Sequence, residues 1–201
     1  MSGRYVALEG VEGAGKSTVA DRLAEMLQAG GTKVCRVREP GGTATGELIR
    51  GVLLEPGGDL APWTEALLFA AGRAQLIRDV VRPALDSDET VISDRSVFSS
   101  LAYQGGGRGL GVEQVRELNR PGLEGTWPDL VVLLRIDAKA GLVRQAVADR
   151  IGGEGVAFQR RVAATFDDLA AKEPDRFCVV DASARIDEVV AAVAAEVARR
   201  W

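Results

Sequence analysis

The chain has 201 residues, enough for one domain with a substantial core, and we predict a single domain over residues 1–201. Its net charge of -4 argues against a broad nucleic-acid interface, because such surfaces are usually basic. The sequence contains no histidine, which excludes imidazole general-base catalysis, Ser-His-Asp triads and nearly all zinc hydrolase designs.

The N-terminus lacks the apolar core of a secretory signal, since Glu9 and Glu12 interrupt it early. No later stretch approaches the roughly 18 uncharged apolar residues of a membrane span. We therefore expect a soluble, cytoplasmic protein that contacts no membrane. Cys35 and Cys178 each lie in an apolar run typical of a strand, which favours two buried free thiols over a disulfide or a metal site.

Short apolar runs alternate along the chain with longer segments of helical periodicity, a pattern typical of a parallel sheet with crossover helices. We predict an α/β fold with a five-stranded parallel sheet flanked by helices. The predicted strands are Tyr5 to Leu8, Val34 to Val37, Thr90 to Ile92, Leu130 to Ile136 and Phe177 to Val180.

Three segments have the spacing of helices. Amphipathic helices are predicted after Lys16, ending at Gly30, and near the C-terminus from Ile186 to Val197. Between them, helix propensity from Trp63 to Leu85 is interrupted only by Gly72 and Pro83, which predicts one long helix.

A glycine-rich segment between the first strand and the first helix satisfies the pattern GxxxxGKS, in the structural context that this motif requires. Its glycines allow backbone N–H groups to converge on phosphate oxygens, Lys16 reaches the β- and γ-phosphates, and Ser17 ligates magnesium. This context disfavours a merely structural glycine turn. The predicted ATP-binding residues here are Gly10, Val11, Glu12, Gly13, Ala14, Gly15, Lys16, Ser17 and Thr18.

A phosphate loop alone does not separate kinases from GTPases and motors. Asn119 is the sole asparagine and Arg120 follows it, so the Asn-Lys-x-Asp guanine signature is absent. Four further segments resemble thymidylate kinases in order and spacing. They are Arg-Glu-Pro-Gly-Gly-Thr at 38–43, Asp-Arg-Ser at 94–96, Ser-Ser-Leu-Ala-Tyr-Gln-Gly-Gly-Gly-Arg-Gly at 99–109 and Pro-Asp-Leu at 128–130.

The resemblance spans essentially the whole chain. It implies the P-loop nucleoside monophosphate kinase fold, with a short lid over about residues 144–158. It also implies transfer of the γ-phosphate of ATP to dTMP, giving dTDP and ADP in dTTP biosynthesis, with Mg²⁺ as cofactor and a homodimer as the assembly. The alternatives are a P-loop kinase for another nucleoside monophosphate or a deoxynucleoside, and a non-catalytic ATP-binding module.

The resemblance assigns roles around the phosphates. Arg95 would clamp the dTMP phosphate and Asp94 would organise magnesium together with Ser17, at the end of a central strand where α/β sheets place their sites. Lys16, Arg95 and Asp94 are therefore predicted catalytic residues. Three residues would shape the acceptor pocket, with a solvated helix arginine as the alternative for the last: Glu39, Pro40 and Arg50.

The nucleoside would be recognised by a second group. Phe69 and Arg73 are four residues apart and share one helix face, with Gln75 beside them. For Phe69 the alternative is a core aromatic. The resemblance places Ser100 at the base edge and Tyr103 beside the sugar, where its ring would disfavour a ribose hydroxyl. Ser99 and Gln104 are further predicted dTMP-binding residues.

Two residues of the phosphate loop carry extra information. By resemblance, Glu12 would contact the acceptor sugar hydroxyl, the alternative being a solvated loop acid. Gly13 stands where some family members have an arginine, which indicates the bacterial type with its catalytic arginine in the lid. We predict Arg150 for this role, and Arg144 as an ATP-binding residue that shares it.

The sequence departs from the family pattern at three positions. The lid is short and poor in arginine, and Gly152 stands where an acid is common. Leu76 replaces the usual histidine of the long helix, and Arg135 replaces the aspartate that usually ends the fourth strand.

Overall fold

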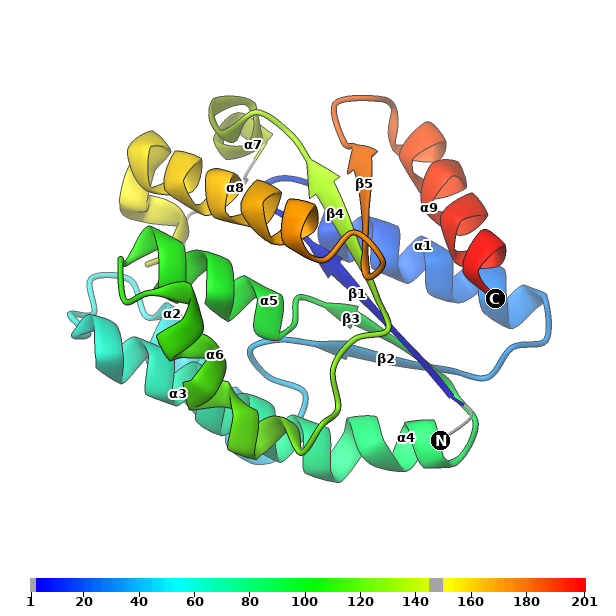
Figure 1. Cartoon of the computed structure of the whole chain (residues 1–201), viewed down its shortest axis with the longest axis horizontal. Coiled ribbons are helices and arrows are strands. Elements are labelled where there is room, and N and C mark those ends of the chain that lie inside the picture. The colour runs from blue at the N-terminus through cyan, green and yellow to red at the C-terminus, as the bar shows by residue number, and fades with distance from the viewer. Residues whose placement is uncertain (1–2, 145–149) are drawn as a thin grey trace.

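The computed structural model describes residues 3–144 and 150–201. Five strands form one parallel sheet in the order β2-β3-β1-β4-β5 (Figure 1). This confirms the predicted α/β class and all five predicted strands. The strands are β1 (Arg4–Glu9), β2 (Val34–Arg38), β3 (Thr90–Asp94), β4 (Leu130–Arg135) and β5 (Phe177–Asp181).

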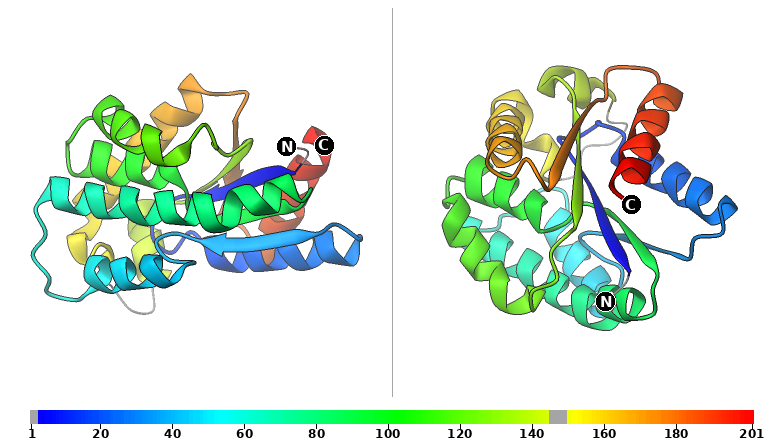
Figure 2. Two further views of the ribbon diagram at one scale, coloured as in Figure 1. Left: turned by 90° about the horizontal axis from the view of Figure 1, so that it is seen from below. Right: turned by 45° about the vertical axis from the view of Figure 1, so that its right-hand side comes forward.

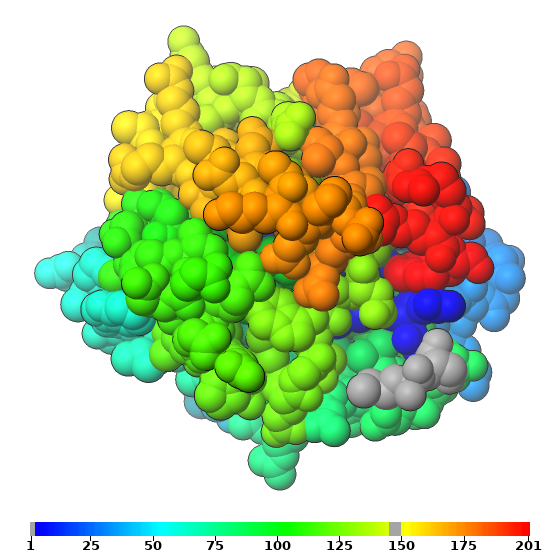
Figure 3. Space-filling view, in the orientation of Figure 1, coloured from blue at the N-terminus to red at the C-terminus, as the bar shows by residue number. Residues whose placement is uncertain are grey.

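Helices cover both faces of the sheet in the described part of the chain (Figure 2). Helices α1 and α9 pack together on one face, while α4, the segment 97–107 and α8 lie on the other. In the space-filling view, α6, α8 and α9 form much of the visible surface (Figure 3). The helices are α1 (Lys16–Ala29), α2 (Ala44–Leu54), α3 (Pro62–Leu76), α4 (Arg82–Asp86), α5 (Val97–Ser100), α6 (Val112–Leu123), α7 (Ala138–Arg144), α8 (Gly155–Lys172) and α9 (Ile186–Arg200).

The predicted long helix is present and contains a wider turn. The π-helical segment η1 (Ile77–Val81) joins α3 to α4 without leaving helical geometry. Pro83 has no N–H to donate to the preceding turn, and a widened turn accommodates such a ring. A second π-helical segment, η2 (Leu101–Gly107), continues α5, and a 3-10 turn, η3 (Gly152–Glu154), precedes α8.

The core lies where the middle strands meet these helices. Strands in the interior of a parallel sheet are buried on both faces, and β1 is buried from Tyr5 to Glu9. This burial explains why the central strands are continuous apolar runs. Because these strands run parallel, the loops after β1, β2 and β3 meet at one end of the sheet.

Both cysteines are free, as predicted, but only Cys178 is buried. Cys35 is partly exposed because β2 is an edge strand of the sheet, which corrects the expectation of two buried thiols. Cys178 lies on the opposite edge strand, so the two thiols are too far apart to pair. Within the described residues, no helix is long and apolar enough to cross a membrane.

Candidate active site

The phosphate loop connects the buried strand β1 to α1. Gly10, Gly13 and Gly15 have φ angles of 143°, 71° and 87°, values that favour glycine over residues with a β-carbon. The first N–H groups of a helix have no intrahelical acceptor, and Gly15, the N-cap of α1, has no side chain to accept from them. Such a helix N-terminus is suited to binding phosphate oxygens.

The side chain of Lys16 folds over this loop. Its buried ammonium donates hydrogen bonds to the carbonyl oxygens of Gly10, at 3.1 Å, and Val11, at 2.8 Å. Burial, with a smaller contribution from the charge of Arg95, lowers the pKa of Lys16 to about 8. A bound phosphate would favour the charged form.

Ser17 and Asp94 lie together beside the loop. The Ser17 hydroxyl donates to Asp94 Oδ2 at 2.5 Å, bringing the start of α1 to the end of β3. One hydroxyl and one carboxylate are oxygen donors of the kind that Mg²⁺ prefers. Among the described residues no group of three or more acids, cysteines or histidines could hold a metal ion. Phosphate oxygens and water would therefore have to complete the coordination of any metal here.

Arg95 joins the phosphate loop to the next pocket. Its guanidinium forms an ion pair with Glu12, donates to Ser99 Oγ at 3.1 Å and lies 4.8 Å from the centre of the Tyr103 ring. The Tyr103 hydroxyl donates to the same Glu12 carboxylate at 3.2 Å. Burial acts to raise the pKa of Glu12, but Arg95 and then Lys16 outweigh it, so the pKa is lowered and Glu12 is ionised at neutral pH.

A pocket lined by both polar and apolar side chains lies on the far side of Arg95. It contains every residue predicted to bind dTMP except Glu12, which instead contacts its edge through Arg95 and Tyr103. Leu54 and Ile151 also line the pocket, and the sequence did not indicate either of them. The lining residues are Glu39, Pro40, Arg50, Leu54, Phe69, Arg73, Arg95, Ser99, Ser100, Tyr103, Gln104 and Ile151.

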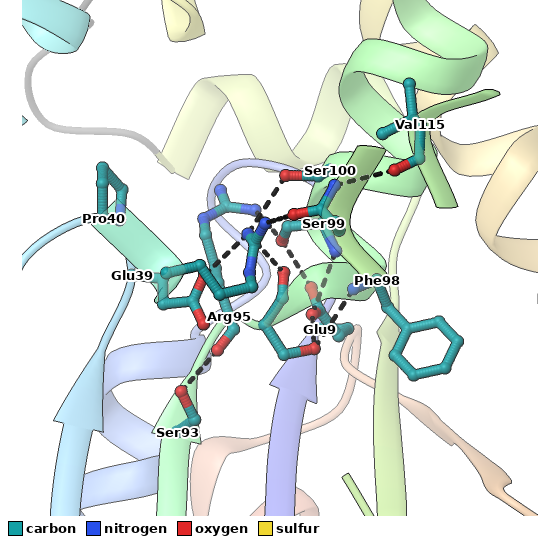
Figure 4. Close-up of polar contacts among 12 residues, drawn as sticks. Glu9, Glu39, Pro40, Ser93, Arg95, Phe98, Ser99, Ser100 and Val115 are labelled. Atoms are coloured by element: carbon teal, nitrogen blue, oxygen red, sulfur yellow. Dashed lines mark hydrogen bonds and ion pairs between the residues drawn. The ribbon is translucent and has the colours of Figure 1, made fainter. Parts of the chain in front are cut away.

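Arg73 is buried in one wall of this pocket, and four groups surround it. Its guanidinium contacts Glu39 Oε2 at 2.6 Å, and donates to Ser100 Oγ at 3.0 Å and to Asn119 Oδ1 at 2.5 Å. The carbonyl oxygen of Ser96 accepts a further bond at 3.2 Å. Figure 4 shows Glu39, Arg95 and Ser100 reaching this region from separate segments. Burial holds the pKa of Glu39 above its ordinary value, although Arg73 opposes that shift.

Arg50 lines the pocket, whereas Gln75, which the sequence placed beside Phe69 and Arg73 on the long helix, does not. Arg50 donates to the carbonyl oxygen of Pro40 at 2.8 Å, which supports the turn containing the cis peptide bond between Glu39 and Pro40. Gln75 does not line the pocket and instead donates to Asp79 within the same long helix. Arg50 therefore contributes to the shape of the pocket.

Sequence reasoning missed Glu9, a fully buried acid at the end of β1. Its carboxylate accepts hydrogen bonds from the Ser96 hydroxyl at 2.7 Å, the Ser99 hydroxyl at 2.5 Å and the Ser99 N–H at 3.1 Å (Figure 4). Burial raises the pKa of Glu9, and the serine hydrogen bonds oppose the shift. An acid ending an otherwise apolar strand was the available signal. Glu9 fixes the start of α5, which carries Ser99 and Ser100.

The two predicted lid arginines occupy different places. Arg144 donates to the carbonyl oxygens of Ala182, at 2.9 Å, and Ser183, at 3.4 Å, in the connection after β5. Arg150 is paired with Glu65 at 2.8 Å and donates to the Leu53 carbonyl oxygen at 2.8 Å. Residues 145–149 of the predicted lid lie outside the described residues. The catalytic role of Arg150 stays a prediction.

Arg95 belongs to both halves of this site. A phosphate loop joined in this way to a second pocket, at the carboxyl ends of parallel strands, defines a P-loop nucleoside monophosphate kinase. Within that class, the family model described as thymidylate kinase matches residues 8–193. The chain belongs to the thymidylate kinase family.

Individual relatives agree with this assignment over nearly the full length. The chain is 47% identical over 188 residues to thymidylate kinase of Pelotomaculum thermopropionicum, covering 91% of this chain and 87% of that protein. It is 46% identical over 201 residues to thymidylate kinase of Deinococcus radiodurans, covering 98% of each. The crystal structure of thymidylate kinase from Ehrlichia chaffeensis superposes with a TM-score of 0.75 at 31% identity, covering 89% of this chain and 92% of that one.

Proposed function

We propose that this enzyme transfers the γ-phosphate of ATP to dTMP, producing ADP and dTDP for dTTP biosynthesis in the cytoplasm. The observation that carries the proposal is the Glu12–Arg95 ion pair, which connects a phosphate-donor loop to the acceptor pocket. Family membership and the relatives named above support dTMP over another acceptor. We further propose that residues 1–201 act as a single domain, with a lid at about 144–158.

The chemistry needs alignment and charge neutralisation. An oxygen of the dTMP phosphate forms a bond to the γ-phosphorus while the bond from that phosphorus to the β–γ bridging oxygen breaks, so ADP leaves without a phosphoenzyme. Lys16, released from its loop carbonyls, would neutralise the β- and γ-phosphates. Arg95 would hold the acceptor phosphate beside them, and the low pKa of Glu12 keeps that arginine paired and oriented.

Ser17 and Asp94 fit a magnesium ion that is also bound by ATP, and we propose them as its protein ligands or ligand-positioning groups. Magnesium, when bound, would neutralise charge on the β- and γ-phosphate oxygens. We expect Asp94→Asn to raise the Mg²⁺ concentration that gives half-maximal rate, with dTMP binding unchanged. An unchanged Mg²⁺ requirement would remove Asp94 from this role.

The acceptor pocket supports recognition of thymine by Phe69, Arg73 and Ser100, which line it together, with Arg73 donating a hydrogen bond to Ser100. The test is an ADP-release assay with dTMP, dUMP, other nucleoside monophosphates and thymidine. A clear preference for dTMP supports the proposal, and a preference for another acceptor contradicts it. ATP binding without any dTMP-dependent ADP release would favour the non-catalytic alternative. A Lys16→Ala variant supplies the background rate.

We also propose a homodimer. Four large apolar side chains are exposed on the neighbouring helices α2 and α3, and such exposure is typical of an interaction surface. Light scattering of the purified protein tests the stoichiometry, and Leu48→Asp with Leu67→Asp should give a monomer. The residues concerned are Leu48, Val52, Trp63 and Leu67.

A further inference from the structure

Glu65 of α3 is a fully buried carboxylate outside the phosphate-binding machinery. Its Oε1 accepts hydrogen bonds from Gln104 at 2.8 Å and from Arg108 at 3.2 Å. Its Oε2 contacts Arg108 at 2.9 Å and Arg150 at 2.8 Å. We call these four residues the Glu65 cluster.

A buried charge is retained only when its partners compensate for the loss of water. Burial acts to raise the pKa of Glu65, but the hydrogen bonds from Arg108 and Gln104 outweigh it and lower the pKa. Glu65 is therefore ionised at neutral pH. Its two arginine partners are mostly buried too, with side chains 16% and 8% exposed for Arg108 and Arg150.

The cluster connects four segments that are distant in sequence. Arg150 donates to the carbonyl oxygen of Leu53 at the end of α2, at 2.8 Å. Arg108 lies at the end of η2 and pairs with Glu154 of η3 at 2.5 Å. Removing the Glu65 carboxylate would leave these two mostly buried guanidinium groups without the negative charge that they share.

Every segment held by the cluster also supplies a wall of the acceptor pocket. Gln104 lines the pocket itself, and the chain neighbours of Leu53 and Arg150, which are Leu54 and Ile151, line it as well. Phe69 lies one helical turn after Glu65 on α3 and lines the same space. The cluster thus holds these walls in one arrangement.

We propose that Glu65 is a positioning residue for the acceptor pocket and that Arg150 acts through it, holding Ile151 and Leu54 in the wall that faces the nucleoside. The inference rests on the proposed function, since it assumes that dTMP occupies this pocket. Arg150 then contributes to acceptor binding. A catalytic Arg150 predicts the opposite kinetic result, a loss of roughly 10³ to 10⁵ in turnover at nearly unchanged dTMP affinity.

The experiment measures kcat and KM for both substrates in Glu65→Gln, Arg150→Ala, Arg150→Lys and the double variant Glu65→Gln/Arg150→Ala. We expect KM for dTMP to rise about tenfold or more in the first two, with kcat and KM for ATP within about threefold of the parent enzyme. Arg150→Lys should lie in between, because lysine can pair with Glu65 but lacks the planar fork that also reaches Leu53. The double variant should have a KM for dTMP no higher than that of the more impaired single variant, since both substitutions remove the same Glu65–Arg150 interaction.

Matched controls separate this result from general destabilisation. Glu117→Gln removes an exposed acid from an i,i+3 pair with Arg120 and should change neither constant. If Glu65→Gln does not fold, Arg108→Lys weakens the contacts to the same carboxylate while keeping the positive charge, at a residue that does not itself line the pocket. Its KM for dTMP should rise severalfold. Thermal unfolding verifies that each assayed variant is folded.

Two outcomes overturn the proposal. A large loss of kcat in Arg150→Ala at unchanged KM for dTMP would identify Arg150 as catalytic. Additive effects in the double variant would show that Glu65 and Arg150 act independently. Failure of the proposed function is a separate result, because it appears in the parent enzyme as absence of dTMP-dependent ADP release.

Discussion

The carbonyl oxygen of Gly141 lies 1.9 Å from the position that a β-carbon on Gly13 would occupy. In the reverse direction, a β-carbon on Gly141 would lie 2.3 Å from the carbonyl oxygen of Glu12. The tip of the phosphate loop therefore packs directly against the backbone of α7. Because the conflict at Gly13 is with a backbone atom, no substitution at position 141 could make room for an arginine at position 13. An arginine at position 13 would therefore clash with this backbone, and Lys16 is the one cation among the loop residues 10–17.

We predict that Gly141→Ala impairs use of ATP. The methyl group would force the loop and α7 apart by a substantial fraction of an ångström, and misplacements near 1 Å cost about 10²-fold in rate. The expected result is a loss of kcat/KM for ATP approaching that size, with dTMP binding by calorimetry within a few fold of the parent. Gly51→Ala is the matched control, since a β-carbon there meets no atom within 4 Å. Unchanged ATP kinetics in Gly141→Ala would disprove the role of this contact.

Asn119 is predicted to position Arg73. Its Nδ2 donates to the Val115 carbonyl oxygen at 2.8 Å, which turns Oδ1 toward the arginine. Asn119→Leu would leave a buried guanidinium N–H without an acceptor, so we expect a loss of about 1–3 kcal/mol in stability and a higher KM for dTMP. Chemical denaturation and steady-state kinetics measure the two effects. The neighbouring exposed Arg120→Leu should change stability by at most about 0.5 kcal/mol. Equal stabilities for the two variants would show that the contact contributes nothing.

We predict that the hydroxyl and the ring of Tyr103 have different functions, the hydroxyl in orienting Glu12 and the ring in excluding a ribose 2′-hydroxyl. Its hydroxyl bonds Glu12, while its ring packs on the Arg95 guanidinium. Tyr103→Phe should lower kcat/KM for dTMP by roughly twofold to tenfold, the range for one lost hydrogen bond. The preference for dTMP over the corresponding ribonucleotide should persist in Tyr103→Phe because the ring remains. It should be smaller in Tyr103→Ala. The ratio of kcat/KM for the two nucleotides measures this. A Phe variant that accepts the ribonucleotide as readily as the Ala variant would contradict it.

The sequence predicted those parts of the molecule that depend on local order. Buried parallel strands must be continuous apolar runs, which located β1 to β5, and the phosphate loop requires glycines at positions of positive φ. The pocket residues were predicted from a resemblance to a known family, which segments such as 99–109 carry. Their catalytic and binding roles remain predictions.

Other features depend on contacts between distant segments, which no local pattern reports. Glu65 lies in a helix, where an acid is most often solvated, and its partner Arg150 is 85 residues further along the chain. Nothing in the sequence distinguished Ile151 from the other residues of the predicted lid. The contact of Arg150 with Leu53 places its neighbour Ile151 in the pocket wall. Cys35 had the neighbours of a core residue, but the position of β2 at the sheet edge exposes it.

The ionised state of Glu65 predicts how stability changes with pH. Its pKa in the folded protein lies below the ordinary value of about 4.3 that the unfolded chain has, so the unfolded chain binds the proton more readily in that range. The stabilisation is therefore fully present above about pH 4.3 and is lost as pH falls through the folded pKa. Glutamine cannot ionise, so Glu65→Gln lacks this pH-dependent contribution.

Thermal unfolding of the parent and Glu65→Gln from pH 7 down to about pH 3 tests this. The difference in Tm should be largest at pH 7 and should narrow below about pH 4 as the parent loses the contribution of the carboxylate. Glu117→Gln, which alters an exposed pair, should show a small difference that does not depend on pH in this way. If the difference in Tm between the parent and Glu65→Gln stays constant over this pH range, hydrogen bonding and packing stabilise the cluster, and the charge of Glu65 does not.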